Sequence, residues 1–167
     1  MAHADYFLKI DGVQGESTAK GEEGAIELDS FSWGLSNRVA ATGGAGGAHA
    51  GRAQFTGFTF GAVSTKASPQ LMSFCASGKH IKEAVLSARK AGEVPVEFMK
   101  IKFTDVLVSS YQQSAASAMQ EFENNTPMDQ VTLNFAKILF QWISQTPGGG
   151  LGEPTLAGFD LEKDEGF

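Results

Sequence analysis

The sequence predicts a mainly β protein, a compact β-barrel of about seven or eight strands with one short α-helix. Several runs of residues alternate between apolar and polar side chains, as strands with one buried face do. Twenty glycines and thirteen phenylalanines favour a turn-rich fold packed by aromatic rings. Only one run has the apolar spacing of a helix. The length of 167 residues favours a single domain over residues 1–167, with an acidic tail from about residue 152 whose order the sequence leaves open.

The first strands are expected before residue 60. Residues 6–10, YFLKI, alternate and then meet Asp11-Gly12, a turn pair. After a polar stretch to about residue 24, residues 25–33 predict a second strand, with Phe31 and Trp33 on one face and serines on the other. Residues 53–60, AQFTGFTF, are rich in the aromatic and threonine side chains typical of a third strand.

The helix is expected within SPQLMSFCASGKH, residues 68–80. Ser68 is a suitable N-terminal cap, and proline fits the first helical turn. Leu71, Met72 and Cys75 are spaced to share one apolar face, and Gly78 supplies the C-terminal stop. A helix of only about ten residues needs tertiary packing to persist.

Longer strands follow the helix. Residues 83–89 predict one strand, and residues 96–111 another, with Met99, Ile101, Phe103 and Leu107 on one face. Residues 112–126 are polar and typical of a loop. In residues 131–143 the apolar positions change phase by one residue between Phe135 and Ile138, which indicates a bulge or burial on both faces. A short strand is expected near residues 156–161.

The segment RVAATGGAGGAHAGR, residues 38–52, consists mostly of glycine and alanine. Such small side chains bury little apolar area, so the segment cannot hold its own shape by burial. Its backbone can instead approach another chain closely. We therefore expect a loop that packs on a neighbouring subunit or ring, and the alternative is a disordered surface loop. The residues expected to contribute are Arg38, Thr42, Gly43, Gly44, Gly46, Gly47, His49 and Arg52.

No motif in the sequence predicts an active site or a cofactor. Gly78-Lys79 lacks the first glycine and the hydroxyl of a phosphate-binding loop, and it follows a helix where that loop would precede one. The three histidines have no paired metal-ligand spacing. Cys75 and His80 are the candidates for nucleophilic catalysis, but the place of Cys75 on an apolar helix face favours a buried structural role. The chain is expected not to be an enzyme and to bind no cofactor or metal.

Charge and cysteine content restrict the partners and the compartment. A net charge of -6 argues against nucleic acid or an anionic membrane as the main partner. A single cysteine requires no oxidising compartment. The first ten residues lack the basic and apolar regions of a classical signal peptide, and no apolar run approaches the roughly 20 residues of a membrane helix. We expect a cytoplasmic protein that leaves the cell, if at all, by another route.

Five ordered blocks of the chain resemble the Hcp family, the tube-forming proteins of bacterial type VI secretion. They are YFLKIDGVQGES, SFSWGLS, STKASPQLMSFCASGKHIKEAVLSARKAG, VEFMKIKFTDVLVSS and VTLNFAKI. No single block is diagnostic, but the ordered set covers nearly the whole chain. The residues after 143 depart from the family pattern.

The resemblance implies a fold like that of phage tail-tube proteins, assembled into hexameric rings. Stacked rings would form the inner tube that a contractile sheath expels with a spike protein, and small effector proteins would ride in the lumen. The SFSWG strand would lie along the channel wall, with Ser30 and Ser32 facing the lumen. The protein would be exported by the type VI route without a signal peptide, and no enzymatic activity is implied. Two other hypotheses stay open: a monomeric ligand-binding β-barrel with an apolar pocket, and a hydrolase with an unrecognised site, which would require that Cys75→Ser removes a hydrolytic activity.

Overall fold

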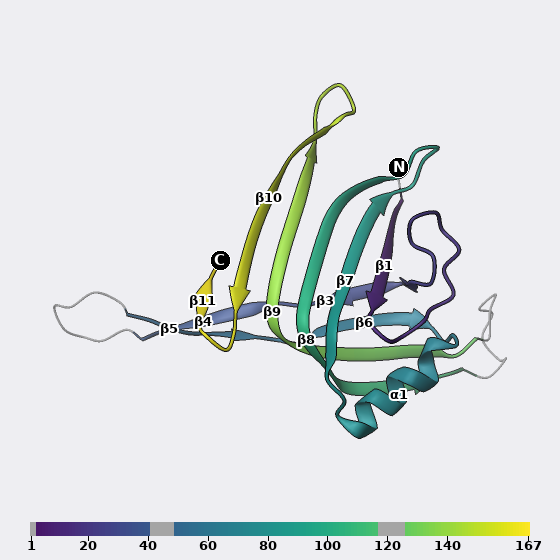
Figure 1. The fold of residues 1–167 in the computed structure, drawn as a ribbon, viewed down its shortest axis with the longest axis horizontal. Coiled ribbons are helices and arrows are strands. Elements are labelled where there is room, and N and C mark those ends of the chain that lie inside the picture. Colours follow the sequence, from purple (N-terminus) through teal and green to yellow (C-terminus); the bar gives the residue numbers. More distant parts are fainter. Residues whose placement is uncertain (1–2, 41–48, 117–125) are drawn as a thin grey trace.

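The computed structural model describes residues 3–40, 49–116 and 126–167 (Figure 1). In these ranges the chain forms one helix and a series of strands, and no helix in them is long and apolar enough to cross a membrane. The elements are β1 Ala4–Ile10, β2 Ile26–Leu28, β3 Ser30–Ser32, β4 Leu35–Ala40, β5 His49–Phe55, β6 Phe58–Val63, α1 Ala67–Ser77, β7 Ile81–Lys90, β8 Val96–Ser114, β9 Met128–Gln145, β10 Leu151–Asp160 and β11 Glu165–Gly166. The predicted class, mainly β with one short helix, is confirmed.

The strands form two sheets. The larger has the order β11-β10-β9-β8-β7-β1-β2, and β6 joins β9 and carries β3 on its other side. The smaller sheet consists of β4 and β5 alone, which project sideways from the body as a ribbon (Figure 1). The main sheet runs from β11 to β2 without closing, so the fold is barrel-like with free edges.

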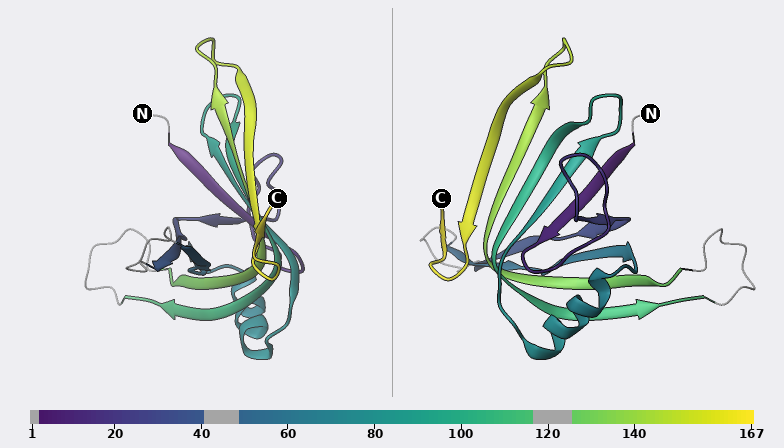
Figure 2. Two further views of the ribbon diagram at one scale, coloured as in Figure 1. Left: turned by 90° about the vertical axis from the view of Figure 1, so that its left-hand side faces the viewer. Right: turned by 45° about the vertical axis from the view of Figure 1, so that its right-hand side comes forward.

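The long strands β8 and β9 connect two layers. The second half of β9 pairs with β10, whereas its first half pairs with β6. Both strands bend where these halves meet, so that an upper and a lower layer diverge from the bend (Figure 2). Asp105 has a φ of 53° at this place in β8, a left-handed conformation that interrupts the regular strand.

That interruption corrects one sequence expectation. Met99, Ile101 and Phe103 are buried as expected, but beyond Asp105 the buried residues are Val106 and Val108, and Leu107 is only half-buried. Strand periodicity places every second residue on one face only while the strand stays regular. The predicted phase change in β9 is confirmed, since Phe135 and Ile138 are both buried.

Two runs expected as single strands are each divided. Residues 25–33 become β2, which pairs with β1, and β3, which pairs with β6. Residues 53–60 become the end of β5 in the ribbon and the start of β6 in the main sheet. Gly57 lies at the second division, where a Cβ atom would come within 2.6 Å of Thr132 and Asn134 side-chain atoms. The close approach of β9 therefore requires glycine there.

The core fills the angle between the layers with aromatic rings. Phe103 of the upper layer lies 4.9 Å from Phe58 of the lower layer and 4.8 Å from Phe135, measured between ring centroids. Helix α1 packs against β8 and buries Leu71, and Cys75 packs at the edge of the core. Met72 is 50% exposed, so its predicted place on the buried face is wrong. Gly78 ends the helix in the left-handed conformation, as predicted.

Candidate functional site

The serines predicted to face the lumen lie on the exposed side of β3. Phe31 points inward between them, with its ring 5.1 Å from that of Tyr6 and 5.7 Å from that of Phe58. Ser30 and Ser32 pair with Gly61 and Thr59 of β6 and line a depression of about 340 Å³. The predicted alternation is therefore confirmed, and it leaves small hydroxyl groups on the outer surface of this strand pair. Their place at a lumen stays a prediction.

The described ends of the glycine-alanine segment, residues 38–40 and 49–52, belong to strands β4 and β5 of the ribbon. Thr42, Gly43, Gly44, Gly46 and Gly47 lie outside the described residues, and His49 is described as the first residue of β5 by its backbone alone. The pairing shifts register between Asn37 and Val39, so that Arg38 occupies the irregular position, and its side chain is exposed. A Cβ atom on Gly51 would lie 2.4 Å from the Arg38 carbonyl oxygen, so glycine is required opposite this irregularity.

Arg52, expected to contact a partner ring, contacts its own chain. Its Nη2 donates a hydrogen bond of 3.0 Å to the carbonyl oxygen of Leu161, and its Nε lies 3.9 Å from a carboxylate oxygen of Asp164. Both acceptors belong to the turn between β10 and β11. The arginine therefore links the base of the ribbon to the C-terminal hairpin.

Aromatic packing strengthens the same link. The ring of Phe55, the last residue of β5, lies 5.5 Å from Phe159 and 5.9 Å from Phe135. Phe167 exchanges two backbone hydrogen bonds with Gly158. The Phe167 ring also lies so close to Gly158 that a Cβ atom added to this glycine would be 2.5 Å from the ring. The tail whose order the sequence left open is thus a hairpin that holds the ribbon base.

A buried carboxylate on β9 is the functional-site candidate that sequence reasoning missed. Asp129 is 4% exposed and accepts hydrogen bonds from Ser64 Oγ at 2.8 Å, from Tyr111 Oη at 3.0 Å, and from Ser68 Oγ. Desolvation by burial, together with the bond to Asp129, raises the pKa of Tyr111. The donors are 18 to 65 residues from Asp129 in sequence, so no short sequence motif predicts this cluster of hydrogen bonds. It joins the start of α1 to the hairpin of β8 and β9.

Ser68 therefore does not cap the helix as predicted. The N-cap residue is Lys66, which makes no side-chain capping bond, and Ser68 lies inside the first turn. Its Oγ accepts the Thr65 N–H at 3.0 Å while donating to Asp129. The sequence pattern indicated a hydrogen-bonding role correctly but assigned the wrong partner, because Asp129 is distant in sequence.

The residues considered for catalysis do not form an assembled site. Cys75 packs against the core, and His80 Nδ1 pairs at 2.8 Å with Asp105 on an exposed surface. Within the described ranges no three His, Cys, Asp or Glu side chains are placed to hold a metal ion. The angle between the layers is filled by phenylalanine rings, so the apolar ligand pocket of the alternative reading has no support in the part of the chain that is described.

Comparison with known proteins gives one consistent result. Residues 7–142 match the family model described as type VI secretion system effector, Hcp. The chain is 35% identical over 163 residues to protein hcp1 of Pseudomonas aeruginosa, covering 96% of each chain. Among solved structures, a type six secretion system protein superposes with a TM-score of 0.90 at 25% identity, covering 99% of this chain and all of the other. Hcp1 from Salmonella typhimurium superposes with a TM-score of 0.78 at 30% identity, with both chains fully covered.

Proposed function

The chain belongs to the Hcp family of type VI secretion system proteins, and from this premise we propose that it is the building block of the secretion tube. Six copies close into a ring, and the rings stack into the inner tube. A contractile sheath expels this tube together with a spike protein. The protein acts after synthesis in the cytoplasm and is exported by the type VI machine itself.

The ribbon of β4 and β5 is the observation that carries this proposal. It pairs with no other described strand, and it projects away from the body (Figure 1). An isolated two-stranded ribbon is marginally stable in water. The Arg52 and Phe55 contacts hold only its base. A partner that packs on the outer part supplies the missing stabilisation, and a neighbouring ring is the partner that fits a tube.

Exposed apolar side chains on the β9–β10 hairpin support contact between copies. Leu151, Leu156 and Trp142 are 56%, 52% and 44% exposed. Within the described chain, β11 and Phe167 cover the outer edge of β10 from Gly158 to Asp160, and the backbone groups before Gly158 are free to pair. Uncovered edges of this kind favour association with another chain, and in a closed ring each neighbour covers the next.

The lumen carries small effector proteins in this proposal. The hydroxyl-bearing surface of β3 and β6, with Ser30 and Ser32, forms part of the channel wall. Small polar groups allow varied cargo to be held and released, because they offer hydrogen bonds without deep apolar burial. The protein acts as a structural component without catalysis or cofactor, and residues 1–167 act as a single domain.

The test is the mass of the protein in solution. Light scattering of the purified chain at micromolar concentration is expected to give the mass of six copies, and electron microscopy of concentrated protein is expected to show tubes. Secretion into the medium should require an intact type VI sheath. A monomeric mass together with the absence of rings by microscopy would contradict the proposal and would favour the alternative, a monomeric ligand-binding β-barrel.

A further inference from the structure

Charge is distributed unevenly along this chain. Residues 30–82 contain five lysines and arginines and no aspartate or glutamate, whereas the other residues contain eight basic and nineteen acidic side chains. The acid-free segment has a net charge of +5 and the remainder has -11. Its described residues contribute β3, the β4–β5 ribbon, β6 and α1, so these elements together carry basic side chains and no acidic ones.

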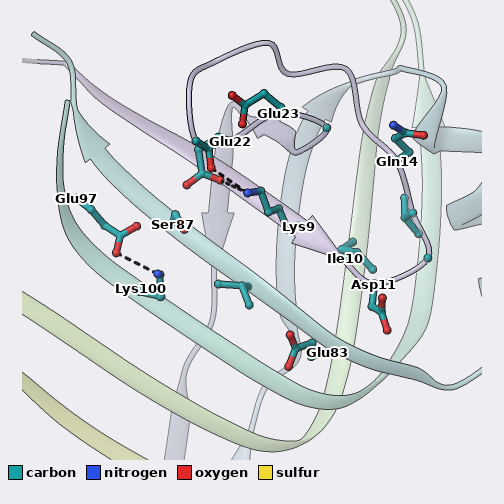
Figure 3. Close-up of a pocket in the computed structure, with 15 residues that line it drawn as sticks. Lys9, Ile10, Asp11, Gln14, Glu22, Glu23, Glu83, Ser87, Glu97 and Lys100 are labelled. Atoms are coloured by element: carbon teal, nitrogen blue, oxygen red, sulfur yellow. Dashed lines mark hydrogen bonds and ion pairs between the residues drawn. The ribbon is translucent and has the colours of Figure 1, made fainter. Parts of the chain in front are cut away.

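An acidic groove of about 580 Å³ lies on the upper layer, between the connection that follows β1 and strands β1, β7 and β8 (Figure 3). Its charged lining consists of two lysines and five carboxylates. They are Lys9, Lys100, Asp11, Glu22, Glu23, Glu83 and Glu97. The groove therefore has three more negative than positive charges.

Three of these carboxylates already have partners. Lys9 lies 3.5 Å from Glu22, and Lys100 lies 3.2 Å from Glu97. Glu83 is paired at 3.2 Å with a lysine beside the groove. Asp11 and Glu23 form no ion pair with any other residue that the structure describes. Hydrogen bonds from its own backbone N–H and that of Gly21 lower the pKa of Glu23, so this carboxylate remains charged at neutral pH.

The lining of the groove also includes a small polar side chain. Ser87 is 5% exposed and lines the groove with its side chain between the two lysine-carboxylate pairs (Figure 3). Its hydroxyl is the small polar group that this part of the lining offers to an occupant of the groove.

The ribbon matches this groove in charge and lies away from it. Arg38 is exposed and forms no ion pair within the described ranges, and the ribbon residues 35–55 include no acidic side chain. The described strands of the ribbon project to one side of the body, whereas the groove is lined by β1, β7 and β8 on the other side of the upper layer (Figure 1). Complementary surfaces on opposite sides of a chain join copies head to tail.

We infer that the acidic groove receives the β4–β5 ribbon of a copy in the adjoining ring, with Arg38 of that copy opposite Asp11 and Glu23. This inference rests on the proposed function and names the surface on which the ribbon docks. The contact is electrostatic at its rim, so salt weakens stacking before it weakens rings held by apolar contacts. Ser87 offers its hydroxyl to the backbone of the docked ribbon.

Disulfide trapping tests the contact directly. Two forms of the chain, each carrying Cys75→Ser, are co-expressed with tags of different size: one has Glu23→Cys and the other Arg38→Cys. The expected result is a disulfide-linked pair of the two forms in the tube fraction and none in the fraction of single hexamers. The matched control replaces Glu23→Cys by Glu93→Cys, an exposed carboxylate outside the groove, and is expected to give no linked pair.

Charge reversal gives a second readout that needs no cysteine. Arg38→Glu is expected to abolish tubes while leaving hexamers, and adding Glu23→Arg in the same chain is expected to restore them. Tubes that form normally with Arg38→Glu, and without a 23–38 link, would overturn the inference and leave the proposed function standing. A link within single hexamers would also overturn it, because the contact would then lie inside a ring. A wild-type protein that forms no ring would instead overturn the proposed function.

Discussion

Ser68, in the first turn of α1, donates a hydrogen bond to the buried carboxylate of Asp129 on β9, 61 residues further along the chain. The same carboxylate accepts the hydroxyl of Tyr111 from β8. One buried charge thus joins the helix to both long strands. A carboxylate with three hydroxyl donors is stable when buried, because each donor replaces a water molecule.

Replacing this carboxylate tests its importance. Asp129→Asn removes the charge with little change in size, and we expect the free energy of unfolding to fall by about 1.5–3 kcal/mol, the range for hydrogen bonds to charged groups. Urea unfolding followed by circular dichroism measures the change. Glu93→Gln, at an exposed position, is the matched control, with an expected change below about 0.5 kcal/mol. Equal unfolding midpoints for the two variants would contradict the role of Asp129.

Adjacent helix residues provide a second comparison. Leu71 is 2% exposed and Met72 is 50% exposed. Leu71→Ala should lower the free energy of unfolding by about 2–5 kcal/mol, because it removes apolar contacts and leaves a cavity. Met72→Ala should change it much less, since half of that side chain is already in water. If both substitutions have the same cost in urea unfolding, the assigned orientation of α1 is wrong.

The stability of the β10–β11 hairpin, which contacts the base of the ribbon, should decrease at low pH because of Asp160. The backbone N–H of Lys163, followed by that of Glu162 and the charge of Lys137, lowers the pKa of this carboxyl from 3.8. Because the pKa of the Asp160 carboxyl is lower in the folded state than in the unfolded state, its ionised form stabilises the fold. This stabilisation is fully present when the pH is above the pKa of the unfolded state. The contribution is lost as the pH falls from 3.8 through the lower folded value.

Comparison of the wild type with Asp160→Asn isolates that effect. At about pH 6 the variant should unfold at lower urea concentration than the wild type, and at about pH 3 the difference should shrink. The turn that Asp160 holds also presents the Leu161 carbonyl to Arg52. A difference that is constant over this pH range would show that the carboxylate charge is not what holds the turn.

The lumen assignment of β3 has its own test. Ser32→Gln places a larger side chain on the exposed surface of this strand. We expect hexamers to form as before but to retain less co-purified effector, because the channel is narrower. Light scattering gives the ring mass, and the effector-to-ring ratio after gel filtration gives retention. Rings that dissociate in this variant would place Ser32 at a subunit contact.

Deleting residues 42–48 tests the ribbon as a stacking element. We expect single hexamers to persist while tubes and secretion are lost, because the deletion shortens the connection between β4 and β5 and leaves the Arg52 anchor at the base of the ribbon. Solution mass reports the rings, and electron microscopy of concentrated protein reports the tubes. Normal tubes and normal secretion would mean that the segment is a solvated surface loop.

Local sequence patterns determined the elements themselves. The turn at Asp11-Gly12, the helix ending at Gly78, the alternation of Ser30, Phe31 and Ser32, and the phase change in β9 were all predictable. Each depends on interactions within a few residues: a left-handed glycine, the helical hydrogen-bond spacing, or the two-residue period of a strand. The family resemblance extended this to the fold class.

The tertiary structure decided which element each residue joins. The run of residues 53–60 reads as one strand, yet it divides at Gly57 because β9 approaches there so closely that only glycine fits. Leu107 loses its predicted place because the left-handed Asp105 reverses the faces of β8 beyond it. Asp129 and Arg52 find partners that are 61 and 109 residues away. Such pairings depend on how strands far apart in the chain meet in space, and a pattern a few residues long carries no information about that meeting.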